Sequence, residues 1–265
     1  MTSTERERIG LRAALALRCT DAVTGALVSN HLVADAWPAA SPDVVRHSSA
    51  SPLSGLLGFG LLPGLHPWQV SFSSNGDPLV WPPLATAMDW VVRVSDPQSR
   101  YLTVLQTVTP PFAEPLSLPL HSASTRPASP GWALVTGQVS DRASHAPVPW
   151  ALVQITIGGT EHDALCDGRG LFRLIAPYPE ALPPLDPAHN TGLGAVGWPV
   201  EIVVLAQPTA LTVAPGSRPG EPPVLTSILD QDEAQVDTAG VLSPTATGRL
   251  VFGVPARFVL TVQPA

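Results

Sequence analysis

The chain has 265 residues, of which 31 are Pro and 21 are Gly, about a fifth of the sequence where roughly an eighth is usual. Pro destabilises a helix interior by about 3 kcal/mol and cannot donate a hydrogen bond inside a central strand, so long helices are excluded and short strands between turns are predicted. The net charge of −7, with no Lys and no cluster of Arg, argues against a nucleic-acid surface, and no apolar run approaches the length of about 18 residues that a membrane helix needs.

The N-terminal segment imitates the signal of an exported lipoprotein, because a short apolar stretch ends at Cys19. Glu5 and Glu7 in the leading part, and Arg18 directly before the cysteine, contradict this interpretation. We therefore expect a cytoplasmic protein with a short N-terminal helical segment. The two cysteines, Cys19 and Cys166, fit a reducing compartment, although one disulfide would also be allowed.

An internal repeat organises the remaining sequence. Three segments, a strand–turn–strand unit, a Gly-rich turn with a short strand, and an alternating strand, occur in the same order in both halves. The pairs are 15–36 with 132–157, 54–65 with 167–179, and 89–102 with 198–211. The alternation of apolar residues in WVVRV and VEIVVLA predicts strands with one buried face.

This repeat predicts an all-β fold of two tandem β-sandwich modules, each with the size and turn spacing of a Greek-key sandwich. We place the first module at residues 1–120, a linker at 121–131, and the second module, with a C-terminal extension, at 132–265. A late helical segment is predicted within 224–237, where the apolar positions stop early.

Two groups of side chains with oxygen, nitrogen or sulfur donors are candidates for metal sites. The first offers four donors within six residues but lacks the second ligand pair of a structural zinc site, and we interpret it as a polar hairpin tip. The second lacks the loop glycine and spacing of an EF-hand, and we interpret it as a solvated helix face. The groups are Glu161, His162, Asp163 and Cys166, and Asp230, Asp232, Glu233 and Asp237.

Signatures of enzymes are missing from the sequence. It contains no nucleophile elbow, no HExxH, no phosphate-binding loop and no dinucleotide fingerprint. We predict no catalytic residue, no metal and no cofactor, and we predict that the protein is not an enzyme.

The seven Trp residues fall into groups with different expected roles. Trp90, Trp132, Trp150 and Trp198 begin or flank predicted strands, where a buried ring anchors sandwich packing, so we expect them in the core.

The segment HPWQVSFSSNGDPLVWPP is rich in Pro and aromatic residues and is predicted to be a loop. Exposed apolar loops on a rigid sandwich commonly make protein contacts. Trp68, Phe72 and Trp81 are therefore our candidate protein-docking residues.

A family resemblance appears in the second repeat, where GQVSDRASHAPVPWALVQI is followed by CDGRGLFRL. This pattern resembles the carboxypeptidase regulatory-like modules, which are transthyretin-like sandwiches. Ser144, His145 and Cys166 depart from the usual pattern. The matching residues are Asp141, Pro147, Val148, Ala151, Val153, Asp167, Gly170 and Phe172, with Asp21, Thr24, Gly25 and Val28 in the first copy.

The resemblance implies that Asp21, Gly25, Asp167 and Gly170 form structural turns. A tight D-G-R-G turn also requires a positive φ that Gly adopts without strain.

The combination of two such modules, with SDPQSRYL in the first and GLFRLIAPYPE in the second, is similar to small accessory proteins encoded beside the sheath and tube of contractile phage-tail-like injection systems. This similarity implies a non-catalytic structural or adaptor subunit, with protein subunits of the particle as partners, no nucleic acid and no membrane insertion. The alternative is a carbohydrate-binding or adhesive module, which would need several exposed Trp rings on one face.

Overall fold

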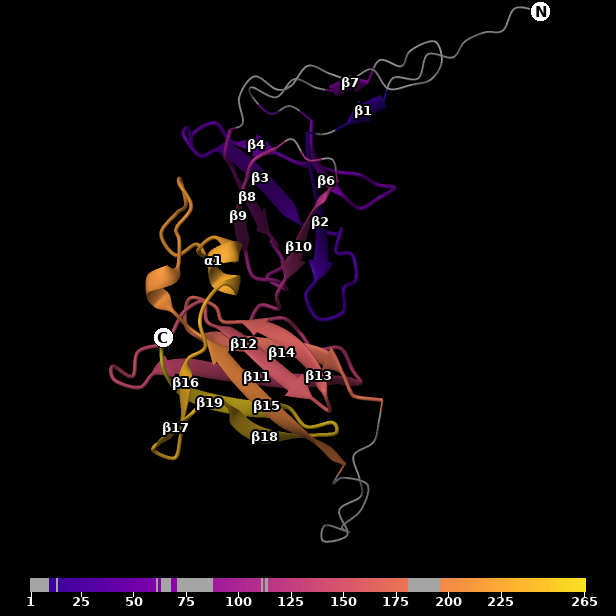
Figure 1. The fold of residues 1–265 in the computed structure, drawn as a ribbon. Coiled ribbons are helices and arrows are strands. Elements are labelled where there is room, and N and C mark those ends of the chain that lie inside the picture. The colour runs from indigo at the N-terminus through magenta and orange to yellow at the C-terminus, as the bar shows by residue number, and fades with distance from the viewer. Residues whose placement is uncertain are drawn as a thin grey trace, which may run out of the picture.

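The computed structural model describes residues 10–12, 14–60, 62, 68–70, 88–110, 112, 114–180 and 196–265. The predicted all-β class is confirmed, because strands form nearly all of the regular structure in these residues (Figure 1). The longest α-helix in the described ranges has five residues, and none there could cross a membrane.

The first module is a sandwich of two four-stranded sheets, in the orders β10-β2-β6-β5 and β4-β3-β8-β9. A separate pair is formed by β1 (Gly10–Arg12) and β7 (Trp68–Val70). The sandwich strands are β2 (Leu15–Asp21), β3 (Val33–Pro38), β4 (Arg46–His47), β5 (Ser49–Ala50), β6 (Leu57–Phe59), β8 (Trp90–Ser95), β9 (Val104–Val108) and β10 (Leu116–Leu120).

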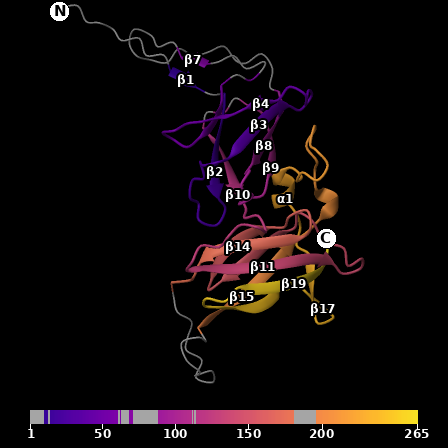
Figure 2. The same ribbon diagram turned by 180° about the vertical axis from the view of Figure 1, so that it is seen from behind.

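The second module packs a five-stranded sheet, β14-β11-β19-β16-β17, on a four-stranded sheet, β13-β12-β15-β18 (Figure 2). Its strands are β11 (Trp132–Asp141), β12 (Leu152–Ile157), β13 (Thr160–Leu165), β14 (Leu171–Pro177), β15 (Gly197–Leu205), β16 (Gln235–Thr238), β17 (Val241–Ser243), β18 (Ala246–Val251) and β19 (Ala256–Gln263).

The two modules share one topology. In each, the first long strand pairs in parallel with the last, as β2 does with β10 and β11 with β19. The remaining repeated segments supply equivalent strands, since β6 and β14 both pair antiparallel with that first strand. The sequence repeat is therefore a repeat of strand order.

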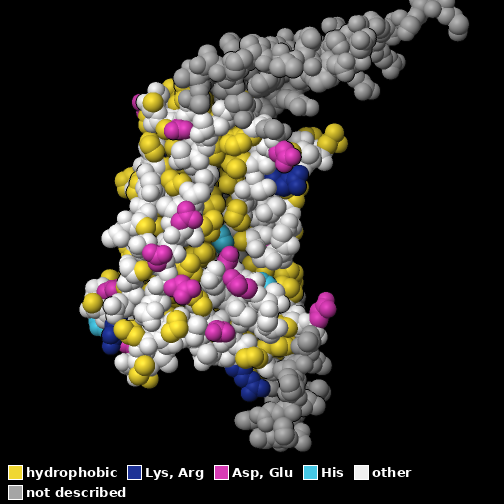
Figure 3. Space-filling model, viewed as in Figure 1, with side chains coloured by type: hydrophobic (Ala, Val, Ile, Leu, Met, Phe, Trp, Pro, Cys, Tyr) yellow, Lys and Arg dark blue, Asp and Glu magenta, His cyan; other side chains and the backbone are white. Residues whose placement is uncertain are grey.

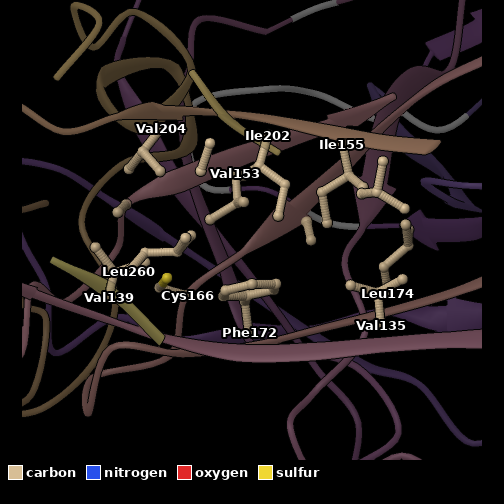
Figure 4. Packing of buried hydrophobic residues seen from close by; sticks show 14 of the residues in the cluster. Val135, Val139, Val153, Ile155, Cys166, Phe172, Leu174, Ile202, Val204 and Leu260 are labelled. Atoms are coloured by element: carbon tan, nitrogen blue, oxygen red, sulfur yellow. The ribbon is translucent and has the colours of Figure 1, made fainter. Parts of the chain in front are cut away.

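Each module has its own hydrophobic core between its sheets. Leu15, Leu17 and Cys19 alternate along β2 and are almost fully buried in the first core, which explains why this segment is a strand. In the second core, Phe172 lies between side chains from both sheets, among them Val153 and Ile202 (Figure 4).

Of the two helical predictions, the structure differs from the N-terminal one and confirms the late one in place but not in length. From Gly10 onward the N-terminal segment forms strands, and residues 1–9 lie outside the described residues. The late helix, α1 (Leu225–Leu229), ends well before residue 237. Beyond it Glu233 bridges Leu205 of β15, and β16 begins at Gln235, so pairing with neighbouring strands overrides the local helical pattern.

A long insertion distinguishes the second module from the first. The connection from β8 to β9 is a short turn, whereas the equivalent connection from β15 to β18 holds a 3-10 helix (Pro208–Ala210), α1 and the β16–β17 hairpin. We call residues 207–231 of this insertion the strap. Figures 1 and 2 show the strap, in orange, leaving the second module and lying beside β9 of the first.

The buried side chain of Gln231 joins the two ends of the strap. Its amide oxygen accepts a hydrogen bond from the backbone of Gln207 at 3.0 Å, and its amide nitrogen donates to the carbonyl oxygen of Trp150 at 2.9 Å. Both ends of the strap are therefore fixed to the second module.

We predict that the modules stay together after the linker is cut. Residues 127–131 are exposed, so a site for a specific protease inserted between Ala128 and Ser129 should be cleaved. The two fragments should co-elute in gel filtration as a particle of about the intact mass of 27.7 kDa. Two separate peaks after cleavage would contradict the prediction, and denaturing electrophoresis controls for complete cutting. The division at 121–131 itself stays a prediction.

Candidate functional site

The predicted docking loop lies mostly outside the described residues. The backbone of Trp68 begins β7 and is paired with Arg12 of β1. Its side chain, and all of Phe72 and Trp81, lie outside the described part, so docking by these residues stays a prediction.

The other Trp residues pack into the fold. Trp90 and Trp198 are buried in the first and second core, as is Trp37 in a third cluster, and Trp132 and Trp150 are half-buried. The expectation of a core position is therefore confirmed for Trp90 and Trp198, whereas Trp132 and Trp150 belong to neither core cluster.

The predicted turn at Asp21 and the turn at Asp141, its counterpart in the second repeat, are built alike. Oδ1 of Asp21 accepts hydrogen bonds from the backbone of Val23 and Thr24 at 3.0 and 3.1 Å, and Gly25 follows with φ +68°. Asp141 accepts from Ala143 and Ser144 in the same way. The residue equivalent to Gly25 is His145, at φ +59°, so the departure from the family pattern places a strained residue there.

The turn at Asp167 closes tightly on the second module. Oδ1 of Asp167 accepts hydrogen bonds from the backbone of Arg169 at 2.8 Å and Leu171 at 3.1 Å. Gly170 has φ +71°, and a Cβ atom there would lie 2.6 Å from the carbonyl oxygen of Val139. Both the backbone angle and the space favour glycine.

The first candidate metal group, at residues 161–166, does not come together in the structure, because its side chains lie on different faces of β13. Glu161 and Asp163 lie on one face of β13, while His162 lies on the other, opposite Ile155 of the core. Cys166 lies inside the second core (Figure 4), where burial raises the pKa of its thiol. Cys19 is buried in the first core, and burial raises its pKa to about 12. Both thiols are free.

The second group, of acids, does not lie on a helix face. Asp230 caps α1 at its C-terminal end, and Glu233 lies in extended chain. Asp237 lies on β16 and accepts a hydrogen bond from Arg142 at 2.8 Å. The prediction of a solvated helix face there is wrong, because the helix ends at Leu229. Within the described residues, no three His, Cys, Asp or Glu side chains are placed to hold a metal ion.

The strap covers the outer face of the β3-β8-β9 sheet. Trp37, Val91 and Leu105 on this face pack against Ala214 and Val224 of the strap in a third buried cluster. Leu105 also forms a bridge with Val224. The expectation that the WVVRV strand has one buried face is therefore wrong, since Trp90, Val92 and Val94 lie in the module core while Val91 lies under the strap.

A chain of polar contacts joins the same two surfaces. Arg93 donates to Asp35 with one nitrogen and, at 2.8 Å, to Glu221 of the strap with the other. His47 contacts the second oxygen of Asp35 at 2.7 Å. Burial alone would raise the pKa of Asp35, but the bonds from Arg93 and His47 outweigh it and hold that pKa below its usual value. Trp37 donates from Nε1 to the carbonyl of Pro215 at 2.8 Å.

A second set of contacts, which we call the joint, lies at residues 121–126. Arg126 donates to Asp21 at 2.7 Å and to Ser122 at 2.9 Å, and Tyr101 donates to Asp21 at 2.9 Å. These bonds hold the linker on the first module and, against the opposing effect of burial, keep the pKa of Asp21 below its usual value.

The joint continues onto the second module through Ser124. Its hydroxyl donates to Asp167 at 2.9 Å, and its carbonyl accepts from Arg173 of β14 at 2.9 Å. Asp21 and Asp167, both predicted as turn residues, thus also anchor the two sides of the joint. Sequence reasoning missed this second role because no local pattern shows which turns face one another.

Comparisons with known proteins give no family for the chain. No family model matches it, and no curated protein matches it. Among solved structures, the TIE protein of Bacillus anthracis aligns with a TM-score of 0.28 and 10% identity over 96% of this chain and 34% of that one. The chain thus spans about a third of that protein.

Two pilins align as well. The shaft pilin SpaA of Lactobacillus rhamnosus GG has a TM-score of 0.23 and 10% identity, over 97% of this chain and 98% of that one. The major pilin BcpA of Bacillus cereus has a TM-score of 0.23 and 7% identity, over 97% and 57%. All three scores lie below 0.5, so conclusions on function rest on this chain's own residues.

We predict that Gly170→Ala destabilises the protein more than Gly25→Ala. Both residues have positive φ, which costs an alanine about 1 to 2 kcal/mol. A Cβ at residue 25 meets nothing within 4 Å, whereas at residue 170 it meets Val139, so overpacking should add about 1 kcal/mol or more. Urea unfolding of both variants measures the difference, and equal losses would contradict the turn geometry.

Proposed function

We propose that this chain is a non-catalytic structural or adaptor subunit of a larger protein assembly. The observation that carries the proposal is the use of its buried charges. Asp21, Asp35 and Asp96 are the buried carboxylates among the described residues, and each is paired with an Arg side chain. Charged groups that hold a scaffold together are not free to act on a substrate.

Open sheet edges give such a subunit a means of attachment. β17 ends the five-stranded sheet, and its side chains Val241 and Leu242 are 66% and 36% exposed. β18 ends the four-stranded sheet of the same module. An open edge can pair with a strand of a neighbouring subunit through backbone hydrogen bonds alone.

The finer assignment is to a contractile phage-tail-like injection particle, assembled in the cytoplasm. The sequence resemblance described above supports it. The SDPQSRYL segment forms the β8–β9 turn, where Asp96 accepts hydrogen bonds from the backbone of Gln98 and Arg100. The GLFRLIAPYPE segment forms β14. Both segments are therefore parts of the sandwich framework.

The surface agrees with protein partners more than with nucleic acid. On the face seen in Figure 3, acidic side chains are spread over both modules with few basic ones between them. Phosphate binding needs several basic side chains together, and this face does not offer them. The alternative of a carbohydrate-binding or adhesive module is not favoured by any specific observation, since no Trp with a described side chain is exposed.

We predict that the double variant Trp68→Ala, Trp81→Ala is lost from assembled particles while the purified protein keeps its melting temperature. Truncating an aromatic anchor costs about 2 kcal/mol or more of binding. The chain would be tagged, co-expressed with its genetic neighbours, and detected in purified particles. Leu53→Ala is the matched control, because Leu53 is 98% exposed and lies elsewhere.

Three outcomes of this experiment would count against the proposal in different ways. Normal incorporation of the double variant would refute the docking loop. A large drop in its melting temperature would place the two rings in a core. Failure of the wild-type chain to co-purify with any sheath or tube protein would refute the particle assignment.

A further inference from the structure

The joint concentrates buried polar atoms that have no hydrogen-bonding partner. Among the described residues, five buried side-chain nitrogen or oxygen atoms have no hydrogen-bonding partner. Four of them belong to His121, Asp163 and Arg173: both ring nitrogens of His121, Oδ1 of Asp163, and Nε of Arg173. Since nearly all buried polar groups in proteins are paired, this concentration requires an explanation.

His121 is held between the two modules. It follows β10 directly, and its carbonyl oxygen accepts a hydrogen bond from the backbone of Leu102. The residue as a whole is only 3% exposed. The carboxylates near its ring are those of Asp163, on β13 of the second module, and Asp21, at the end of β2. The other charged groups of the joint are Arg126 and Asp167, each bonded as described, and Arg173.

Burial decides the charge of this ring. It lowers the pKa of His121, and the nearby Asp163 and Asp21 raise it by less, so the pKa lies below its usual value. At neutral pH the ring is therefore uncharged. Charging it would place a cation at a residue that is only 3% exposed, where the backbone of Asp163 and the carboxylates of Asp163 and Asp21 favour the charge but do not outweigh the cost of burial.

We propose that the joint is a proton-sensitive latch, in which uptake of a proton from solvent by the ring of His121 loosens the contact between residues 121–126 and β13. The strap lies on another part of the first module and bonds through Arg93, Trp37 and Leu105. It keeps the modules tethered while the joint opens. Acidification thus changes how the modules are set against one another without separating them.

The sign of the pH dependence follows from linkage. The unfolded chain binds the proton with an ordinary pKa of about 6.5, and the folded chain binds it more weakly. The stability that neutral His121 provides is complete above that pH and is lost as the pH falls below it. A single histidine binds one proton, so it can add at most about one unit of log K of unfolding per pH unit to the slope.

The test compares urea unfolding between about pH 7.5 and about pH 5 for the wild type and three variants. His121→Phe keeps the ring and removes the proton site, so its pH slope should be shallower than that of the wild type. Asp163→Asn removes a charge that favours the protonated ring, so its stability should fall more on acidification. His31→Asn is the control, because His31 is exposed, and Asn tolerates its positive φ.

Small-angle X-ray scattering supplies the second measurement. The radius of gyration of the wild type and of His31→Asn should increase on acidification before unfolding, and that of His121→Phe should not. Equal slopes for His121→Phe and the wild type would overturn the proposal. Different slopes with an unchanged radius of gyration would also overturn it, because His121 would then be an ordinary buried histidine. If His121→Phe does not fold, His121→Gln is measured with the same expectations.

Discussion

The apolar outer face of the β3-β8-β9 sheet is the constraint on which the rest of the structure depends. Val91 and Leu105 are fully buried there, although each lies on the side of its strand that faces away from the module core. Exposing such a side chain costs about 1.5 to 3 kcal/mol, so this face must be covered. The strap of the second module covers it with Ala214 and Val224, and α1 also contributes Leu225 to the first core.

The polar contacts give the two modules a defined arrangement that apolar burial alone would not fix. Arg93 reaches Asp35 and Glu221 with separate nitrogens, which requires the strap to lie in one position. The joint supplies a second fixed point through Arg126 and Ser124. Two contacts of different chemistry, one under the strap and one at the linker, allow the linker contact to respond to protons while the strap contact persists.

Sequence reasoning predicted the features that are encoded locally. The Asp21 side chain and the Gly25 backbone form their turn from local contacts, and alternation along β2 marks its core face, so this strand and this turn were predicted where they occur. The helix within 224–237 was predicted too long, because pairing of Glu233 with β15 is not a local property. The contact of the strap with this sheet was missed for the same reason, although three consecutive apolar residues from Trp90 to Val92 were a signal in the sequence that both faces are covered.

Differential scanning calorimetry of the wild type and Val224→Asp tests the central claim, that the strap makes the two modules one cooperative body. The wild type should unfold in a single transition whose calorimetric and van't Hoff enthalpies agree. Val224 is buried against Leu105 and Val91. A carboxylate there should detach the strap, so the calorimetric transition should divide into two, with the first module unfolding at the lower temperature. Two transitions in the wild type, or one unchanged transition in Val224→Asp, would contradict the account.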